Sequence, residues 1–292
     1  MAVAVATAER ELEAVRERSF GVAYRMLGSV AEAEDVAQEA MLRLARTDEE
    51  IREPLAWITT VATRLSINVL RLARTRREAY VGPWLPEPLI DDESDEVGGH
   101  AEMADSLSQA FLVVLERLTP VERAAFLLRE VFEYDYPQVP AIIDRSEANA
   151  RQLVVRAKKH LDANRPRFDA DVALRDRLLE RFVAAAEAGD LEALEAMLAE
   201  DAAFYSDGGG KASAARKPIF GRARLARVFV ALARTMRRHG LFTDQRVHIG
   251  GQPARIRRTP DGSIFSVFSI DVVDGRIKTI WVIRNPDKLA HL

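Results

Sequence analysis

The sequence contains no cysteine, and this absence excludes disulfide bonds and thiolate metal sites. It is typical of a protein that works in a reducing compartment, so we expect a cytoplasmic location. The chain also lacks an apolar run that approaches the roughly 18 residues of a membrane span. Its first residues, 1–6, lack the basic segment that opens a signal peptide. We therefore expect no membrane as a partner.

An excess of charge of either sign is also missing, because 42 lysines and arginines against 45 aspartates and glutamates leave a net charge of −3. A protein that coats DNA non-specifically needs many clustered cations, which displace counterions from the phosphates. Here the basic residues form local clusters, at 71–77 and at 151–167. An acidic tract at 91–96 lies between them, near prolines and two glycines, and we interpret it as a solvated linker.

The chain does have enough length, 292 residues, for about two or three domains. Its first part, to about residue 80, shows the apolar periodicity of helices. One helix is predicted to end at Gly28, and Ser29 with Glu32 forms a capping box for the next. A third helix is predicted from Leu55 to the first group of arginines.

A helix-turn-helix is predicted between residues 119 and 159. Thr119 and Glu122 form a capping box around Pro120, a short segment at 137–143 follows, and a basic third helix begins after Ser146. Such a helix suits the major groove of DNA, although three short amphipathic helices also form a plain bundle. Prolines at 137 and 140 predict a late start for the middle helix and leave the angle of the third helix open.

The last part of the chain changes from helices to strands. Two helices are predicted before residue 201, and strands at 203–206, 246–250, 254–258, 263–272 and 276–284. Asp274-Gly275 supplies the positive φ angles of a type I′ hairpin turn. This order predicts an α+β domain in which helices pack on the concave face of a curved antiparallel sheet.

Several motifs resemble one protein family. Residues 20–45 (Phe20-Gly21-Val22 to Leu44) resemble the second conserved region of extracytoplasmic-function sigma factors, and residues 106–162 resemble their fourth region. Three further motifs resemble the members with a fused C-terminal SnoaL-like domain: Trp84-Leu85-Pro86-Glu87-Pro88, Asp207-Gly208-Gly209-Gly210-Lys211 and Asn285-Pro286-Asp287-Lys288-Leu289.

The resemblance implies a multidomain protein. We expect an all-α region 2 domain at 1–80, a linker at 81–104, an all-α region 4 helix-turn-helix domain at 105–168, and a regulatory SnoaL-like α+β cone at 169–292. The implied function is promoter recognition and transcription initiation as a sigma factor, without catalytic residues, metal or cofactor. The implied partners are promoter DNA and core RNA polymerase, through its beta-prime clamp and beta flap. No separate anti-sigma factor is expected to be obligatory, and a small ligand of the cone is a further candidate.

The same resemblance assigns roles to particular residues. Polymerase binding falls on one helix, at Asp35, Gln38, Glu39 and Leu42. Contacts to the minus-ten element fall on the next helix, beside a base-binding loop at 48–54, at Trp57, Thr60, Arg64, Asn68 and Arg71. Contacts to the minus-thirty-five element fall on the recognition helix, at Ser146, Glu147, Asn149, Arg151, Gln152, Arg156 and Lys159. The residues of the three motifs at 84–88, 207–211 and 285–289 are assigned to a regulatory interdomain contact.

Alternatives remain open from sequence alone. Trp57 suits a helix core as well as DNA. Cones of this kind include isomerases and cyclases, for which Asp244, His248 and Asp271 would be the acid-base candidates. A DNA-binding ligand sensor is the other alternative. For the interdomain contact, we expect Trp84 to be an apolar anchor and Lys211 to pair with Glu87 or Asp287.

Overall fold

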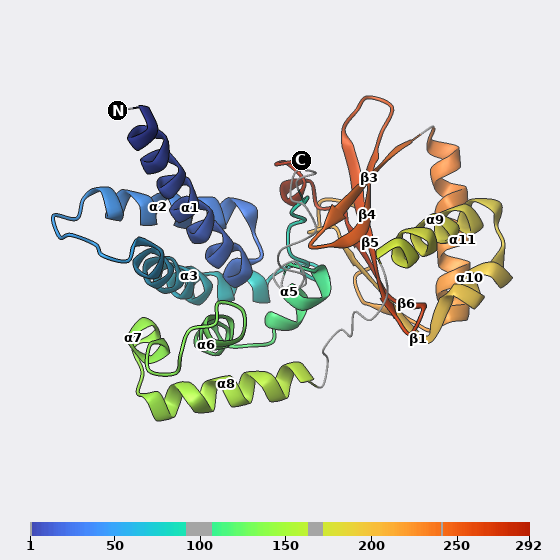
Figure 1. Ribbon diagram of the computed structural model, residues 1–292. Coiled ribbons are helices and arrows are strands. Elements are labelled where there is room, and N and C mark those ends of the chain that lie inside the picture. Colours follow the sequence, from blue (N-terminus) through green and yellow to red (C-terminus); the bar gives the residue numbers. More distant parts are fainter. Residues whose placement is uncertain (1, 92–106, 163–171, 241) are drawn as a thin grey trace. The chain divides into compact units, whose positions relative to one another are not determined.

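The computed structural model describes residues 2–91, 107–162, 172–240 and 242–292 (Figure 1). These residues form two compact units. Unit 1 comprises the chain up to residue 78 together with 114–164, and unit 2 comprises 79–113 together with the chain from 165 onwards. The acidic residues at 92–96, interpreted above as a solvated linker, lie outside the described residues, as do Arg165 and Arg167.

Three helices begin unit 1: α1 (Ala2–Leu27), α2 (Val30–Ala45) and α3 (Pro54–Glu78). Gly28 separates α1 from α2 with a φ of 65°, a left-handed conformation that glycine adopts without strain. Ser29 then caps α2, because its side chain accepts a hydrogen bond from the backbone N–H of Glu32 at 3.3 Å. The core that α1, α2 and α3 share includes Val15, Ala40 and Ile58.

The predicted helix-turn-helix is present in unit 1 as α6 (Pro120–Glu130), α7 (Val139–Ile143) and α8 (Glu147–Asp162). The capping box is complete, and the backbone N–H of Thr119 donates to the Glu122 carboxylate at 3.1 Å. Pro140 lies in the first turn of α7, where a proline removes no helical hydrogen bond. The middle helix therefore starts late and stays unbroken, and it ends at Asp144 in a left-handed conformation.

Unit 2 contains a six-stranded sheet with the order β2-β1-β6-β5-β4-β3. The strands are β1 (Leu198–Asp207), β2 (Ile219–Phe220), β3 (Thr243–Ile249), β4 (Gln252–Arg258), β5 (Ile264–Val273) and β6 (Arg276–Ile283). The expectation of a wholly antiparallel sheet is wrong, because β1 runs parallel to β6. A parallel pair needs a long crossover, and the chain between these two strands contains helix α11 (Arg222–His239) and the other strands.

Helices cover one face of this sheet. They are α9 (Val172–Ala188), α10 (Leu191–Met197) and α11, and Figure 1 shows them together on that side of unit 2. Their apolar side chains, including Phe182, Leu194 and Phe229, pack with Ile270 and Ile280 of the sheet. Among the described residues, no helix is long and apolar enough to cross a membrane.

The opposite face of the sheet is covered by segments from far apart in the sequence. Leu85 of the linker, Ala110 of α5 (Gln109–Leu115) and Leu289 of the tail pack with Val267 and Trp281. The short helix η1 (Pro286–Lys288) leads into this tail. Residues before and after the acidic tract therefore belong to the same core as the sheet.

Asp91, the first residue of the acidic tract, is bound to the turn between β3 and β4. Its two carboxylate oxygens accept hydrogen bonds from the backbone N–H groups of Gly250 and Gly251, each at 2.8 Å. Its own N–H donates to the carbonyl oxygen of His248 at 2.9 Å. The interpretation of this tract as solvated is therefore wrong at Asp91, because the turn offers two backbone donors that point at one carboxylate.

Candidate nucleic-acid interface

The predicted minus-ten residues follow one stripe of α3, because their spacings of three and four residues return to the same helix face. Arg64, Asn68 and Arg71 are exposed on this stripe. Thr60 is half-buried, and its hydroxyl donates to the carbonyl oxygen of Ala56 at 3.0 Å. The stripe therefore presents two cations and an amide to its surroundings.

Trp57, at the start of the stripe, is half-buried and packs against the core of α1, α2 and α3. This contact agrees with the alternative that Trp57 is a core aromatic. An indole that is only half-buried retains an exposed edge, so a role in DNA binding stays a prediction.

Arg64 is bound to the helix-turn-helix. Its Nε atom donates to the carbonyl oxygen of Ile142 at 3.0 Å, and Nη2 donates to that of Ala141 at 2.6 Å. Both acceptors lie in the last turn of α7, where carbonyls have no helical partner and the helix dipole favours a cation. A side chain predicted to contact the minus-ten strand is thus occupied by the neighbouring helix.

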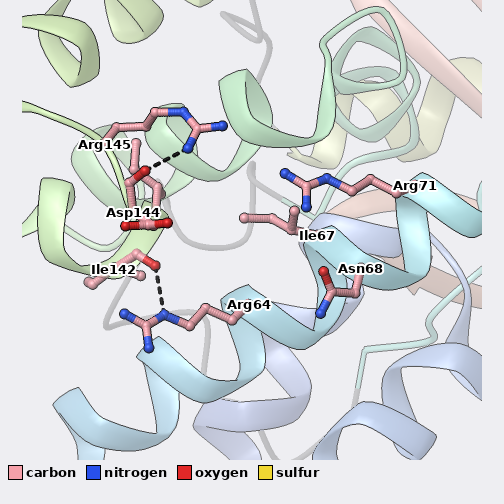
Figure 2. Close-up of a pocket in the computed structure, with 8 residues that line it drawn as sticks. Arg64, Ile67, Asn68, Arg71, Ile142, Asp144 and Arg145 are labelled. Atoms are coloured by element: carbon pink, nitrogen blue, oxygen red, sulfur yellow. Dashed lines mark hydrogen bonds between the residues drawn. The ribbon is translucent and has the colours of Figure 1, made fainter.

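A cavity of about 440 Å³ lies beside this contact, and Figure 2 shows the residues that line it. Ile67, Asn68 and Arg71 line it from α3, and Asp144 and Arg145 line it from the turn between α7 and α8. The Arg145 guanidinium donates to the carbonyl oxygen of Asp144 at 2.6 Å. Residues predicted for the minus-ten element therefore face the helix-turn-helix in this arrangement of unit 1.

The predicted minus-thirty-five residues are all exposed on α8 or just before it. Ser146 caps the helix, accepting a hydrogen bond from the backbone N–H of Asn149 at 3.3 Å. Arg151 pairs with Glu147 at 2.7 Å, and its guanidinium lies 4.2 Å from the ring centre of Tyr136. An exposed pair of this kind contributes little free energy, so Arg151 can exchange Glu147 for a base or a phosphate. The buried face of α8 holds Ala150, Leu153, Val154, Ala157 and Leu161.

The predicted polymerase-binding residues share one face of α2. Asp35, Gln38 and Leu42 are exposed, and Leu42 is 43% exposed although it is apolar. Glu39 is half-buried and pairs with Arg43 at 2.8 Å. The opposite face packs into unit 1 through Ala33, Val36, Ala37 and Ala40.

In unit 2, the three family motifs meet at Asp207, whose side chain is fully buried. One carboxylate oxygen accepts hydrogen bonds from the hydroxyl of Tyr80 at 2.6 Å and from the N–H of Gly209 at 3.0 Å. The other accepts from the N–H of Leu85 at 2.9 Å and from Nζ of Lys288 at 2.7 Å. Asp207 therefore joins the linker, its own loop and the tail.

Lys288 is the cation of this contact and is 5% exposed. It also donates to the carbonyl oxygen of Leu85, and its Nζ atom lies 4.0 Å from the ring centre of Trp84. Trp84 was predicted to be an apolar anchor; its ring is half-buried and contacts this cation, so its role as an anchor stays a prediction. Burial, followed by the hydrogen bond to Asp207, raises the pKa of Tyr80 above its usual range.

The glycine loop requires residues without side chains. A Cβ atom on Gly208 would lie 2.2 Å from the carbonyl oxygen of Ala212, and one on Gly209 would lie 2.3 Å from Nδ2 of Asn285. Gly209 also has a φ of 58°. The loop can therefore approach the tail only with glycine at these positions.

The remaining motif residues lie around this centre. Lys211 pairs with Asp287, one of its two expected partners, at 2.5 Å on the surface. The Asn285 amide donates to the Tyr80 hydroxyl at 2.8 Å. The carbonyl oxygen of Pro86 accepts from Gln109 at 3.1 Å, and Pro286 is exposed. Glu87 is half-buried, whereas Pro88 and Leu289 are buried. Gly210 lies in the loop next to Val81 of the linker.

Three contact residues could not be found by sequence reasoning. Tyr80 and Gln109 lie outside the motifs, and no local pattern links them to Asp207 or Pro86. Arg123 lies on an otherwise ordinary amphipathic helix, yet it is buried, donates to the carbonyl oxygen of Met26 at 2.6 Å and pairs with Glu116 at 2.7 Å. Only the tertiary structure brings these groups together.

The acid-base candidates have separate partners. Asp244 binds Arg255 and Arg257, and these hydrogen bonds outweigh the opposing effect of burial and lower the pKa of Asp244. His248 lies 3.5 Å from Asp176 on the surface. Asp271 is buried and accepts from Nε1 of Trp281 at 2.6 Å. Nothing in these contacts arranges the three side chains around a shared substrate position.

The comparisons with known proteins agree with the sequence resemblance. The profile of Sigma-70 region 2 matches residues 12–77, and that of Sigma-70, region 4 matches residues 108–161. The ECF RNA polymerase sigma factor SigJ of Mycobacterium tuberculosis is 36% identical over 290 residues, which cover 96% of this chain and 92% of that protein. The chain belongs to the extracytoplasmic-function RNA polymerase sigma factors. As such it directs RNA polymerase in promoter recognition and transcription initiation.

The similarity to this sigma factor extends through the α+β unit. The crystal structure of SigJ from M. tuberculosis aligns with a TM-score of 0.76 and 33% identity, covering 96% of this chain and 98% of that one. The probable ECF sigma factor SigI of M. tuberculosis is 31% identical over 176 residues, covering 59% of this chain and 60% of that protein. The expected architecture, two all-α sigma regions followed by an α+β domain, is confirmed.

Our first prediction concerns the buried pair of Asp207 and Lys288. Lys288→Met should lower the free energy of unfolding of unit 2 by about 3–5 kcal/mol, because it leaves a buried carboxylate without its cation. The matched control is Lys211→Met, which breaks an exposed pair and should cost at most about 1 kcal/mol. Urea unfolding followed by tryptophan fluorescence measures both. Equal losses in the two variants would contradict the central place of Asp207.

The second prediction concerns Asp271. Burial, opposed by the Trp281 hydrogen bond, raises the pKa of Asp271 from 3.8 to about 7. The folded protein therefore binds this proton more tightly than the unfolded chain does. The resulting contribution to the free energy of unfolding is complete below the pKa that Asp271 has in the unfolded chain, and it is lost as the pH rises through 7. The loss should reach about 4 kcal/mol. Asp271→Asn should abolish this pH dependence of the free energy of unfolding, measured by unfolding titrations at several pH values. A difference in free energy between parent and variant that stays the same at every pH would contradict the prediction.

Proposed function

We propose that this sigma factor uses three exposed helix faces of unit 1 for its partners. The face of α2 with Asp35, Gln38, Glu39 and Leu42 binds the beta-prime clamp of core RNA polymerase, and the helix-turn-helix binds the beta flap. The stripe of α3 and the loop at 48–54 bind the minus-ten element. The exposed face of α8 binds the minus-thirty-five element, where arginine, asparagine and glutamine are suited to base edges.

One observation supports this assignment above the others. Each of the three assigned sets lies on a single face of one helix, while the opposite face of that helix supplies core residues. Polar side chains that are fixed by such a core are preorganised for a partner surface. A plain three-helix bundle places no such requirement on the outward residues.

We further propose that the contact between Arg64 and α7 has to open before α3 meets DNA. The two hydrogen bonds hold the guanidinium against the helix-turn-helix and use two of its five N–H donors. A guanidinium that donates to neutral carbonyl oxygens can exchange them for the charged oxygens of a phosphate, which accept stronger bonds. Promoter DNA and polymerase together would thus favour the open state by differential binding.

Unit 2 is proposed to regulate this step through the linker, in the absence of a separate anti-sigma factor. Residues 80–91 join the two sigma regions of the chain, and they are held by Asp207 at one end and by the turn at Gly250 at the other. Fixing this segment limits the separations that the two regions can adopt. The role is regulatory rather than enzymatic, requires no cofactor or metal, and is exercised in the cytoplasm.

The polymerase assignment gives the third prediction. Asp35→Ala combined with Glu39→Ala should reduce capture of core RNA polymerase at least about tenfold, because the two carboxylates lie outward on α2 and charge pairs at an interface are worth about 1.5 kcal/mol or more. The control is Glu192→Ala with Glu200→Ala, which removes two carboxylates from unit 2. Circular dichroism verifies the fold. Equal capture by both double variants would show that this face of α2 does not bind polymerase.

The fourth prediction concerns regulation by the linker. Trp84→Ala removes the ring that Lys288 contacts. A cation–π contact of this kind is worth about 1 kcal/mol, so its loss should shift the equilibrium between the held and the released linker roughly fivefold. Transcription from a cognate promoter with reconstituted polymerase should change accordingly, while core capture stays constant. Phe220→Ala, at another partly exposed aromatic of unit 2, is the control. If both variants transcribe like the parent, the motif contact is structural and has no regulatory role.

A further inference from the structure

Helix α11 differs in composition from its surroundings. It contains six arginines and no lysine, aspartate or glutamate within Arg222–His239. The whole chain has a net charge of −3, so this cation density is local. Nothing in the assignments above, all of which place DNA contacts in unit 1, uses this helix.

Burial divides α11 into two faces. Leu225, Ala226, Phe229 and Val230 are buried in the core beneath the sheet. The exposed residues Arg224, Arg227, Ala231, Arg234 and Arg238 follow each other at steps of three and four, which places them on one stripe. With a rise of about 1.5 Å per residue, the stripe is about 21 Å long. The packed face fixes the helix, and the arginines therefore form a rigid row.

Six other described cations of unit 2 are neutralised by ion pairs. Arg246 and Arg255 pair with Glu180, Arg257 with Asp244, Lys278 with Asp201, Lys211 with Asp287, and Lys288 with Asp207. By contrast, the four arginines of the stripe form no ion pair with any residue in the described part of the chain. This includes Glu192 and Glu195 of α10, the helix that packs against α11.

A row of unneutralised arginines has a cost for the helix. Arg224 and Arg227, and again Arg234 and Arg238, are like charges three or four residues apart, a spacing that destabilises a helix. An anionic partner along the row removes this repulsion. Each guanidinium presents a planar fork of donors that matches phosphate oxygens, which a lysine ammonium does not.

We propose that α11 of unit 2 binds the phosphate backbone of duplex DNA. Duplex DNA is the polyanion on which a sigma factor works, and it carries about one charge per 1.7 Å of its axis, so a 21 Å row faces several phosphates. Contacts of this kind fix position and orientation and carry no base sequence. Unit 2 then anchors the protein on promoter DNA in addition to any hold on the linker.

The test compares two triple variants that remove the same charge. One is Arg227→Gln, Arg234→Gln and Arg238→Gln on the stripe, and the other is Arg246→Gln, Arg276→Gln and Lys278→Gln elsewhere on unit 2. The probe is a fluorescein-labelled 30-base-pair duplex of random sequence, titrated with the full chain by anisotropy between about 50 and 200 mM salt. Losing three phosphate contacts should reduce the slope of log K against log salt by about 2.7 and weaken binding at the lowest salt more than about tenfold. The control variant should match the parent.

A second measurement keeps the proposal testable if the stripe variant folds poorly. A photo-crosslinking amino acid at Ala231, which is exposed within the row, should attach to the duplex, whereas one at Asp274 in the β5–β6 turn should not. Equal salt slopes for both triple variants, or no crosslink to DNA from Ala231, would overturn the proposal. A crosslink from Ala231 only to a protein subunit of the holoenzyme would overturn it in favour of an acidic protein partner. The anisotropy titration and the crosslink to the duplex need no polymerase, so their outcome is independent of the core-binding test.

Discussion

The buried carboxylate of Asp207 is the constraint on which the organisation of unit 2 depends. Removing a carboxylate from water costs several kcal/mol, and only a cation with further hydrogen bonds offsets that cost. Asp207 receives one donor from Tyr80, one from Leu85, one from Gly209 and the charge of Lys288. No single motif supplies these groups. The linker, the glycine loop and the tail are therefore required together, which gives a physical reason for three short motifs so far apart in one sequence.

This constraint also determines what the linker is. A proline-containing, acidic segment between the two sigma regions suggests a solvated linker, and its composition supports that interpretation. The backbone of Leu85 is nevertheless engaged on both sides, its N–H by Asp207 and its carbonyl oxygen by Lys288, while its side chain lies in the core with Trp281 and Leu289. The described part of the linker thus packs as a further layer on one face of the sheet.

Features that depend on neighbouring residues could be predicted from the sequence. The helix cap at Ser29, the capping box at Thr119, the late start of α7 and the turn at Asp274 each follow from local chemistry, and all are present. Features that depend on distant pairing could not. The parallel contact of β1 with β6 joins strands that are separated in the sequence by β2, α11, β3, β4 and β5, and nothing in either strand specifies the direction of its partner.

The same distinction applies to side chains. Amphipathic spacing placed Arg151 and Asp35 on exposed faces, because only the helix period was needed. It could not show that Arg64 would bind the carbonyls of Ala141 and Ile142, since that contact joins residues more than seventy positions apart. Nor could composition distinguish Asp91, which binds a turn, from the other acids of its tract. A carboxylate is identified as structural only when its donors are known.

The contact of Arg64 with α7 and the pair of Asp207 with Lys288 differ in what their opening leaves behind. Arg64 is exposed, so water can hydrogen-bond to its guanidinium when the contact with α7 opens, and no charge is left without a partner. Separating Asp207 from Lys288 leaves uncompensated charge in a dry interior and costs about 3–5 kcal/mol. On the proposed function, we therefore expect binding energy from polymerase or promoter DNA to release Arg64 within unit 1 more readily than the linker within unit 2, because only the second step leaves buried charge without a partner. We propose that the minus-ten element is met while the linker is still held, so that the cone acts on an engaged complex as well as on the free protein.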